Sequence, residues 1–357
     1  MSDIFPTAPA PVVTRLEPDA VPAEIVDHLR AGAIVAPAEV GVIDLDGPEG
    51  GTGAVTCFQG LLTNDIEKPG DGAFVYGALL TPKGMIVVDG WAARAGSRVR
   101  YTVPAEGRER ALQILQRSVP PRLAVTTDRS AATAVLRIAG AHAAAVMGAA
   151  GVAVPHTPNR VVQGLIGTVP AEIARATDLA PFVFQITIAA EAIDTVQGRL
   201  VTAGAHRATA AALELARVLA GWPGLASEVD EKTIPQEVRL DEIGGVSYTK
   251  GCYTGQETVS RLHFRGHANR NLRGLMFETD PPAAPASGWS AVTHEERDVG
   301  RVTSIAWLPD GGGSVLGRWI GLAMVRRDVP AGAIVRAAGR EARLVGLPFD
   351  APHVAPA

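Results

Sequence analysis

The sequence predicts an α+β fold in which two mixed α/β subdomains are followed by a small all-β module. Residues 40–46 and 86–93 are short apolar runs bounded by glycine- and proline-containing turns, a pattern typical of strands. Strand-like and helix-like segments then alternate as far as residue 220. After Gly266 the helical periodicity stops, and only short strand-like runs follow. The change of pattern divides the chain into an α+β region and a β module, which we expect to be a barrel.

The elements before Gly266 follow from local periodicity. Residues 98–103 alternate as a strand does, and a helix is expected over 106–119, after Pro104, because four apolar residues recur at helical spacing: Ala111, Leu112, Leu115 and Val119. The other expected strands are 123–127, 134–138, 161–169 and 182–188, and the other expected helices are 190–201 and 208–220.

The β module is predicted from four strand-like runs at 272–277, 300–307, 319–325 and 333–344. Turn-forming residues separate them: Pro281-Pro282, Gly311-Gly312-Gly313 and Pro330-Ala331-Gly332. We therefore expect a partly flexible N-terminus (1–30), an α+β region of two subdomains (31–265), a barrel (266–350) and a flexible tail (351–357).

Composition excludes some classes of protein. A chain of 357 residues exceeds one ordinary core, and 47% hydrophobic with 20% charged residues is typical of a well-folded globular protein. The net charge of -4 argues against a protein whose whole surface binds nucleic acid. It is compatible with a local basic patch. No secretory leader or membrane span is recognisable, so a cytoplasmic protein is expected, and a monomer is compatible with the sequence.

The segment 250–257 mixes a thiol, an amine, an amide and a carboxylate between two glycines, which predicts an ordered functional loop. Cys252 lies two residues from Lys250, and an ammonium stabilises a nearby thiolate. Cys252 is therefore a candidate nucleophile, redox centre or cluster contact, with a buried hydrogen-bonded thiol as the alternative. Lys250 would polarise Cys252 or bind an anionic tail, with a solvated lysine as the alternative. Gln256 and Glu257 would contact a ligand or tie the loop to its neighbours.

Residues 261–273 hold four arginines, two histidines and no acid. Arg261, Arg265 and Arg270 are candidates to bind polyglutamate, RNA phosphate or an acidic partner protein. The alternative is a linker whose arginines pair with carboxylates of neighbouring domains. His263 and His267 have helical spacing, but the intervening Gly266 disfavours that helix, so no metal site is predicted.

Several motifs together carry a family resemblance. They are Gln59-Gly60-Leu61-Leu62-Thr63-Asn64-Asp65, Thr81-Pro82-Lys83-Gly84 with Asp89 after it, Lys250-Gly251-Cys252-Tyr253-Thr254-Gly255-Gln256-Glu257, and Arg265-Gly266 with Arg270 after it. The chain resembles the YgfZ-type folate-binding proteins of the aminomethyltransferase superfamily from about residue 40 to residue 348.

The resemblance implies three subdomains in a ring around a central hole that holds tetrahydrofolate, with the loop 250–257 facing it. It assigns folate contacts to Asn64, Asp65, Asp89, Arg217, Tyr253, Gln256 and Glu257. Where the superfamily usually carries an acidic residue that contacts the pterin, this chain has Leu219. Asn64, Asp65 or Glu257 would then supply substitute acceptors.

Three functions follow as expectations. The first is a tetrahydrofolate-binding accessory protein that assists assembly or repair of iron–sulfur clusters in client enzymes, including tRNA-modifying ones, with Cys252 as key residue and in transient contact with a cluster. The second is a folate-dependent one-carbon transferase, in which Asp89 acts on the folate amine. The third is an RNA- or protein-docking module that uses residues 261–273.

Overall fold

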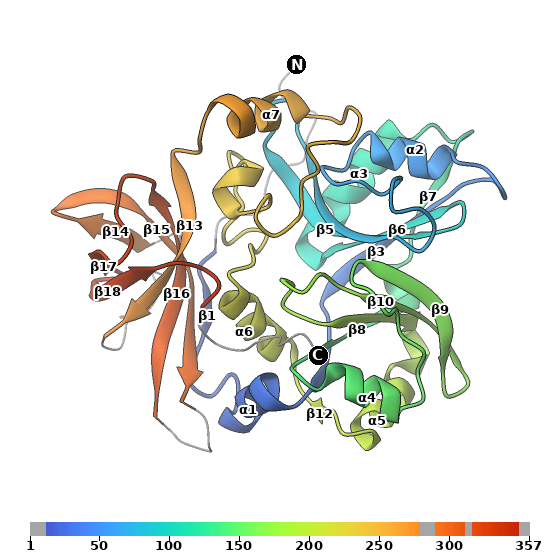
Figure 1. The fold of residues 1–357 in the computed structure, drawn as a ribbon, viewed down its shortest axis with the longest axis horizontal. Helices are drawn as coiled ribbons and strands as arrows, with labels where there is room; N and C mark the ends of the chain where they lie inside the picture. The colour runs from blue at the N-terminus through green and yellow to red at the C-terminus, as the bar shows by residue number, and fades with distance from the viewer. Residues whose placement is uncertain (1–11, 279–289, 311–315, 350–357) are drawn as a thin grey trace.

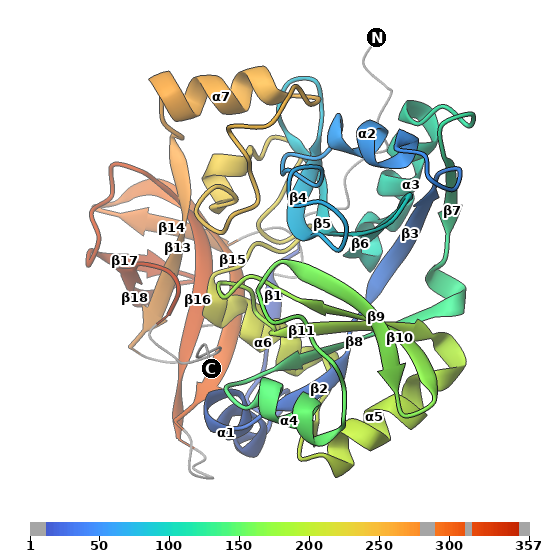
Figure 2. The ribbon, with the colours of Figure 1, turned by 45° about the vertical axis from the view of Figure 1, so that its right-hand side comes forward.

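The computed structural model describes residues 12–278, 290–310 and 316–349. The chain forms three sheets, and Figure 1 shows the C-terminal one apart from the other two. In Figure 2 the C-terminal strands stand on the left, while the two other sheets lie one above the other on the right. The predicted α+β class is confirmed.

The five-stranded sheet is antiparallel and has the order β4-β5-β6-β3-β7. Its strands are β3 (Val40–Asp46), β4 (Phe74–Leu80), β5 (Ile86–Ala95), β6 (Arg98–Pro104) and β7 (Val125–Asp128). The helices in this part of the chain are α2 (Gly53–Gln59) and α3 (Arg108–Ser118). Every residue of β4 is buried, so the sheet is covered on both faces at this strand.

The six-stranded sheet has the order β12-β2-β8-β11-β10-β9. Its strands are β2 (Ile34–Pro37), β8 (Thr133–Ala139), β9 (Arg160–Ile166), β10 (Val169–Arg175), β11 (Phe184–Ala189) and β12 (His206–Arg207). The accompanying helices are α4 (Ala143–Ala149), α5 (Ile193–Thr202) and α6 (Ala210–Ala220). The single strand predicted over 161–169 is instead part of a hairpin of β9 and β10, because Gly167 turns the chain with a φ of 65°.

The C-terminal sheet is the predicted barrel. Its strands are β13 (Arg270–Phe277), β14 (Ser290–His294), β15 (Arg297–Pro309), β16 (Gly317–Arg326), β17 (Ile334–Ala337) and β18 (Arg340–Val345). Pairing of β15 with β16 closes these six strands. Two elements come from the range 1–30: β1 (Thr14–Leu16) adds to β15 in parallel, and α1 (Ala23–Ala31) leads into β2.

The three parts share one core. The largest buried cluster includes Ile34 from β2, Leu45 from β3 and Leu322 from β16. In both figures α6 lies between the barrel and the other two sheets. Burial of common apolar surface holds the parts together, which fixes any cavity at their junction. None of the helices among the described residues is long and apolar enough to cross a membrane.

Candidate functional site

A cavity of about 430 Å³ lies where the three sheets meet. Asp89 of β5, Arg137 of β8 and Leu16 of β1 all contribute to its wall, and α6 contributes Glu214 and Arg217. This volume lies in the range of small-molecule sites, which are commonly found between structural units.

Asp89 is a buried carboxylate in the wall of this cavity. Its side chain is 4% exposed, and the Tyr76 hydroxyl donates a hydrogen bond of 2.7 Å to Oδ2. Oδ1 is buried and has no hydrogen-bond partner among the described residues. Burial raises the pKa of Asp89 to about 6, against a lowering by the Tyr76 hydrogen bond. A buried acceptor without a partner costs roughly 1 to 3 kcal/mol, so Oδ1 is positioned for a donor that the protein does not supply.

Four aromatic residues form part of the wall: Tyr76, Trp91, Phe182 and Trp222. Trp91 and Trp222 are nearly parallel, with centroids 5.8 Å apart and planes at 10°. The ring centroids of Tyr76 and Trp222 lie 4.6 Å apart, and those of Phe182 and Trp91 lie 5.2 Å apart. Aromatic side chains beside a buried carboxylate suit a planar ligand that carries N–H donors.

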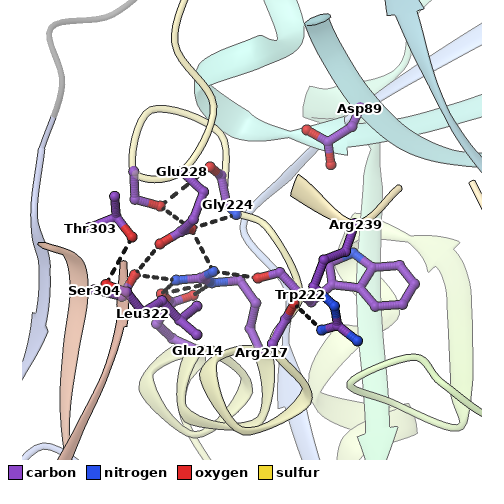
Figure 3. A network of polar contacts seen from close by, with 12 residues as sticks. Asp89, Glu214, Arg217, Trp222, Gly224, Glu228, Arg239, Thr303, Ser304 and Leu322 are labelled. Atoms are coloured by element: carbon purple, nitrogen blue, oxygen red, sulfur yellow. Dashed lines mark hydrogen bonds and ion pairs between the residues drawn. The ribbon is translucent and has the colours of Figure 1, made fainter. Parts of the chain in front are cut away.

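Arg217, a predicted folate contact, holds the wall instead of facing the cavity freely (Figure 3). All three of its side-chain nitrogens donate hydrogen bonds: Nε to Glu214, Nη1 to Glu228 Oε2 at 2.8 Å and to the Trp222 carbonyl oxygen at 2.6 Å, and Nη2 to Glu214 and to Ser304 Oγ at 2.9 Å. Glu228 is fully buried; burial alone would raise its pKa, but Arg217 and the surrounding hydroxyls lower it. The guanidinium thus fixes Trp222.

The acidic residue of α6 that faces the cavity is Glu214, which the sequence analysis missed. Leu219, on the same helix, is 2% exposed and belongs to the core. Glu214 is half-buried and accepts from Arg217. The signal that could have found this wall was the tryptophans, since two of only five in the chain, Trp91 and Trp222, lie here.

Lys250 is buried, and its ammonium is fully engaged by backbone. Nζ donates to the carbonyl oxygens of Gln59 at 2.6 Å, Leu62 at 2.6 Å and Asn64 at 2.9 Å. Burial lowers its pKa to about 8, while Asp65 and Glu67 act in the opposite direction. An ammonium with three donors on three carbonyls is a structural clamp. It joins two of the sequence motifs, residues 59–65 and 250–257.

Asn64 and Asp65 make hydrogen bonds in the same region, next to the contact between residues 59–65 and 250–257. Asn64 Nδ2 donates to the carbonyl oxygens of Tyr76 and Gly244, each at 2.8 Å. Asp65 Oδ1 accepts from Gln59 and from two backbone N–H groups. Both residues line a second cavity of about 320 Å³, and Tyr76 lines both cavities. Neither residue lines the Asp89 cavity.

The predicted loop is shorter than expected, because Gln256 and Glu257 begin helix α7 (Gln256–Arg265). The sequence hid this start, since the preceding Gly255 is left-handed with a φ of 81° and offers no capping side chain. Cys252 is an exposed free cysteine. Tyr253 is buried, and its hydroxyl has no hydrogen-bond partner among the described residues. No residue of 250–257 lines the Asp89 cavity.

The three arginines of the basic segment do not form one group. Arg261 and Arg265 are exposed on α7. Arg270, on β13, donates to Glu237 at 2.8 Å and lies 3.7 Å from Asp230. The geometry of Arg270 matches the alternative of an arginine paired with carboxylates of a neighbouring unit, and anion binding remains a prediction for Arg261 and Arg265.

Residues 26–246 match the family model described as the GCVT N-terminal domain. That match spans more than half of the chain. The chain belongs to the GCVT N-terminal domain family. The predicted recognition, a YgfZ-type member of the aminomethyltransferase superfamily, is confirmed by this match together with the relatives below.

A relative from Rubrobacter xylanophilus named aminomethyltransferase is 27% identical over 87% of this chain and 81% of its own length. A Vibrio vulnificus protein named tRNA-modifying protein YgfZ is 30% identical over 38% of this chain, and the match covers 45% of that protein. The chain therefore aligns with less than half the length of this YgfZ relative.

Among solved structures, the aminomethyltransferase T of the glycine cleavage system from Bartonella henselae superimposes with a TM-score of 0.71 over 92% of this chain and 89% of that one, at 19% identity. This likeness confirms the predicted aminomethyltransferase-like fold.

Proposed function

We propose that this member of the family binds a reduced folate in the Asp89 cavity and acts as an accessory protein in the assembly or repair of iron–sulfur clusters in client enzymes, including tRNA-modifying ones, with Cys252 as its key residue. The observation that supports folate binding is the buried, unpartnered Oδ1 of Asp89 in a cavity that Trp91 and Trp222 also line.

The residues of the cavity fit a pterin. Its ring is flat and carries amino and N–H donors, which suit a wall that contains Tyr76, Trp91 and Trp222 and the free acceptor of Asp89. Glu214 supplies a second carboxylate to the same cavity, and in this proposal it replaces the acidic residue that the superfamily usually carries at the position of Leu219. Bound tetrahydrofolate would supply one-carbon chemistry; the protein side would orient it through these contacts.

The position of Cys252 supports the proposed role toward client iron–sulfur enzymes. Its exposed thiol lies outside the Asp89 cavity, on a loop that Lys250 clamps to the chain around residues 59–64. A thiol on a fixed, exposed loop is placed for contact with another protein or a cluster rather than for chemistry on the folate. The YgfZ relatives, named as tRNA-modifying proteins, support the choice of client class.

The folate half is tested by anaerobic calorimetric titration with tetrahydrofolate. We expect binding by the wild-type chain and at least about tenfold weaker binding by Asp89→Asn, because the amide keeps the acceptor but loses its charge. Cys252→Ala is the matched control and should bind as the wild type does. No binding by the wild-type chain, or equal binding by Asp89→Asn, contradicts the proposal.

The proposed role in iron–sulfur cluster assembly is tested by complementation. The chain is expressed in a strain that lacks its own homologue, and the activity of an iron–sulfur tRNA-modifying enzyme is measured. Cys252→Ala should fold normally, since the side chain is exposed, yet fail to restore activity. Thr254→Ala in the same loop is the control. Full restoration by Cys252→Ala would remove the thiol from the mechanism.

A second candidate is a folate-dependent aminomethyl or methyl transferase. Two observations favour it: the aminomethyltransferase relative matches over most of its length, and the Asp89 pKa of about 6 suits proton transfer near neutral pH. Single-turnover reaction of an aminomethyl donor with tetrahydrofolate tests it. Formation of a one-carbon folate that is lost in Asp89→Asn would establish a transferase, and absence of product would leave the accessory role.

A further inference from the structure

Two histidines and a glutamate from distant parts of the chain meet at one edge of the six-stranded sheet. Glu24 Oε1 lies 3.9 Å from His28 Nε2 and 3.9 Å from His206 Nδ1. The two imidazole rings are stacked, with centroids 3.2 Å apart and planes at 14°. One ligand atom from each residue lies within 4.8 Å of the other two. The residues belong neither to the folate cavity nor to the Cys252 loop.

The fold creates this cluster by strand pairing. Glu24 and His28 are one turn apart on α1, so they share a face of that helix. The chain continues from α1 into β2, and β12 pairs with β2 in parallel, with His206 opposite Ile34. The sequence does not indicate this cluster, because His206 lies far from Glu24 and His28 in the chain. It comes close to them only when β12 pairs with β2.

The surroundings orient the ligand atoms. A Cβ on Gly32 would lie 2.7 Å from His28 Nδ1, so that nitrogen faces the Gly32 backbone and Nε2 faces Glu24. Among the described residues, no hydrogen bond shorter than 3.5 Å is made by the side chains of Glu24, His28 or His206. Their side chains are 75%, 27% and 41% exposed, respectively, which leaves the cluster open to ions from solvent.

We infer that Glu24, His28 and His206 form a binding site for a divalent transition metal ion such as Zn²⁺, with water completing the coordination. Imidazole nitrogen and carboxylate oxygen are the donors that zinc prefers among side chains without sulfur. Bonds of about 2.0 to 2.1 Å place tetrahedral ligand atoms about 3.3 Å apart, so each ligand atom moves by less than about 1 Å. The imidazoles leave their stacked arrangement by turning about their side-chain bonds, which the exposed His206 and Glu24 permit.

The ion would join α1 to the strand that precedes α6. Because α6 begins at Ala210, four residues after His206, and carries Glu214 of the cavity wall, the site braces the helix on which that wall is built. The role inferred is structural and independent of the proposed function.

Calorimetric titration with ZnCl2 tests the site on the full chain without an affinity tag. Cys252→Ser is the background, because the exposed thiol would itself bind zinc. One Zn²⁺ should bind per chain, and His206→Gln and Glu24→Gln should each weaken binding at least about tenfold. His267→Gln, which removes another exposed histidine, should leave binding unchanged. Circular dichroism without metal checks the fold of each variant, and the 75% exposed Glu24 provides a variant that folds.

Nitrogen NMR of the imidazoles gives a second readout. Zinc should shift His28 Nε2 and His206 Nδ1 and leave His267 unchanged. Absence of binding at about 100 μM Zn²⁺, or equal binding by His206→Gln, Glu24→Gln and the background chain, overturns the inference.

Discussion

Two buried ionisable side chains, Asp89 and Lys250, differ in how far hydrogen bonds within the protein compensate for their burial. Lys250 places its three donors on three carbonyl oxygens, so its burial is compensated and its contribution is structural. Asp89 receives one hydrogen bond, from Tyr76, and keeps its other oxygen without a partner. A cost that no intramolecular contact offsets is expected where a ligand completes the site.

We predict that Asp89→Asn stabilises the chain at neutral pH. Burial raises the Asp89 pKa from 3.8 to about 6, so the folded state holds that proton more tightly than the unfolded state does. Stability of the wild-type chain should therefore fall as pH rises from about 4 to about 6 and then level off. The uncharged amide avoids this loss.

The measurement is urea denaturation of both chains between pH 4 and pH 8. Asp89→Asn should exceed the wild type by about 1 to 3 kcal/mol at pH 7.5, and the difference should shrink toward pH 4. A constant difference across that range would show that ionisation of Asp89 is not its source.

At the scale of elements, the turn around Gly255 is where three motifs pack together. A Cβ on Gly255 would lie 2.5 Å from the Thr81 carbonyl oxygen and 3.0 Å from the Gly84 Cα atom, and its φ is 81°. Thr254 N–H donates to the Gly60 carbonyl oxygen at 3.1 Å. Glycine is required here both for the left-handed backbone and for the close approach of two loops.

We predict that Gly255→Ala destabilises the chain by about 2 to 4 kcal/mol, because strained backbone and a steric overlap add. Gly251→Ala in the same loop is the matched control: a Cβ there meets no atom within 4 Å, and its φ is not positive. Thermal unfolding measures both variants. A similar midpoint for the two would mean that the contact between residues 81–84 and Gly255 does not hold the loop.

For the whole molecule, the buried pair of Arg217 and Glu228 connects the α+β part to the barrel. Ser304 of β15 accepts a hydrogen bond from Arg217 and donates one to Glu228 Oε1 at 2.7 Å. Arg217 also donates to the carbonyl oxygen of Trp222, which lies in the cavity wall (Figure 3). Packing of the barrel and shape of the cavity are thus fixed by one network.

We predict that Glu228→Gln destabilises the chain by about 3 to 5 kcal/mol, because it leaves the Arg217 charge buried with fewer acceptors. The half-buried Glu214→Gln should cost less, since water reaches that partner. Denaturant titration measures both variants. If Glu228→Gln proved as mild as Glu214→Gln, the network would not be what holds the barrel against α6.

Local patterns predicted many of the elements because alternation and helical spacing are properties of neighbouring residues. They predicted β3, β5, β6, α3 and α6 and the start of the barrel. They did not give α7, whose first turn lacks a capping side chain, or the hairpin of β9 and β10, where one glycine breaks an apparently continuous strand. They did not show that residues 59–65 and 250–257 lie together, a contact that Lys250 makes through the carbonyl oxygens of Gln59, Leu62 and Asn64.

The sequence by itself determined the fold class, the family and the importance of Asp89 and the Cys252 loop as candidates. The tertiary structure alone decided that Arg217 pairs with Glu228, that Glu214 and the two tryptophans line the cavity, that Cys252 lies outside it, and that His206 meets Glu24 and His28. Each of these depends on which distant segments pack side by side. Side-chain burial and pairing are set by those contacts, and local periodicity carries no information about them.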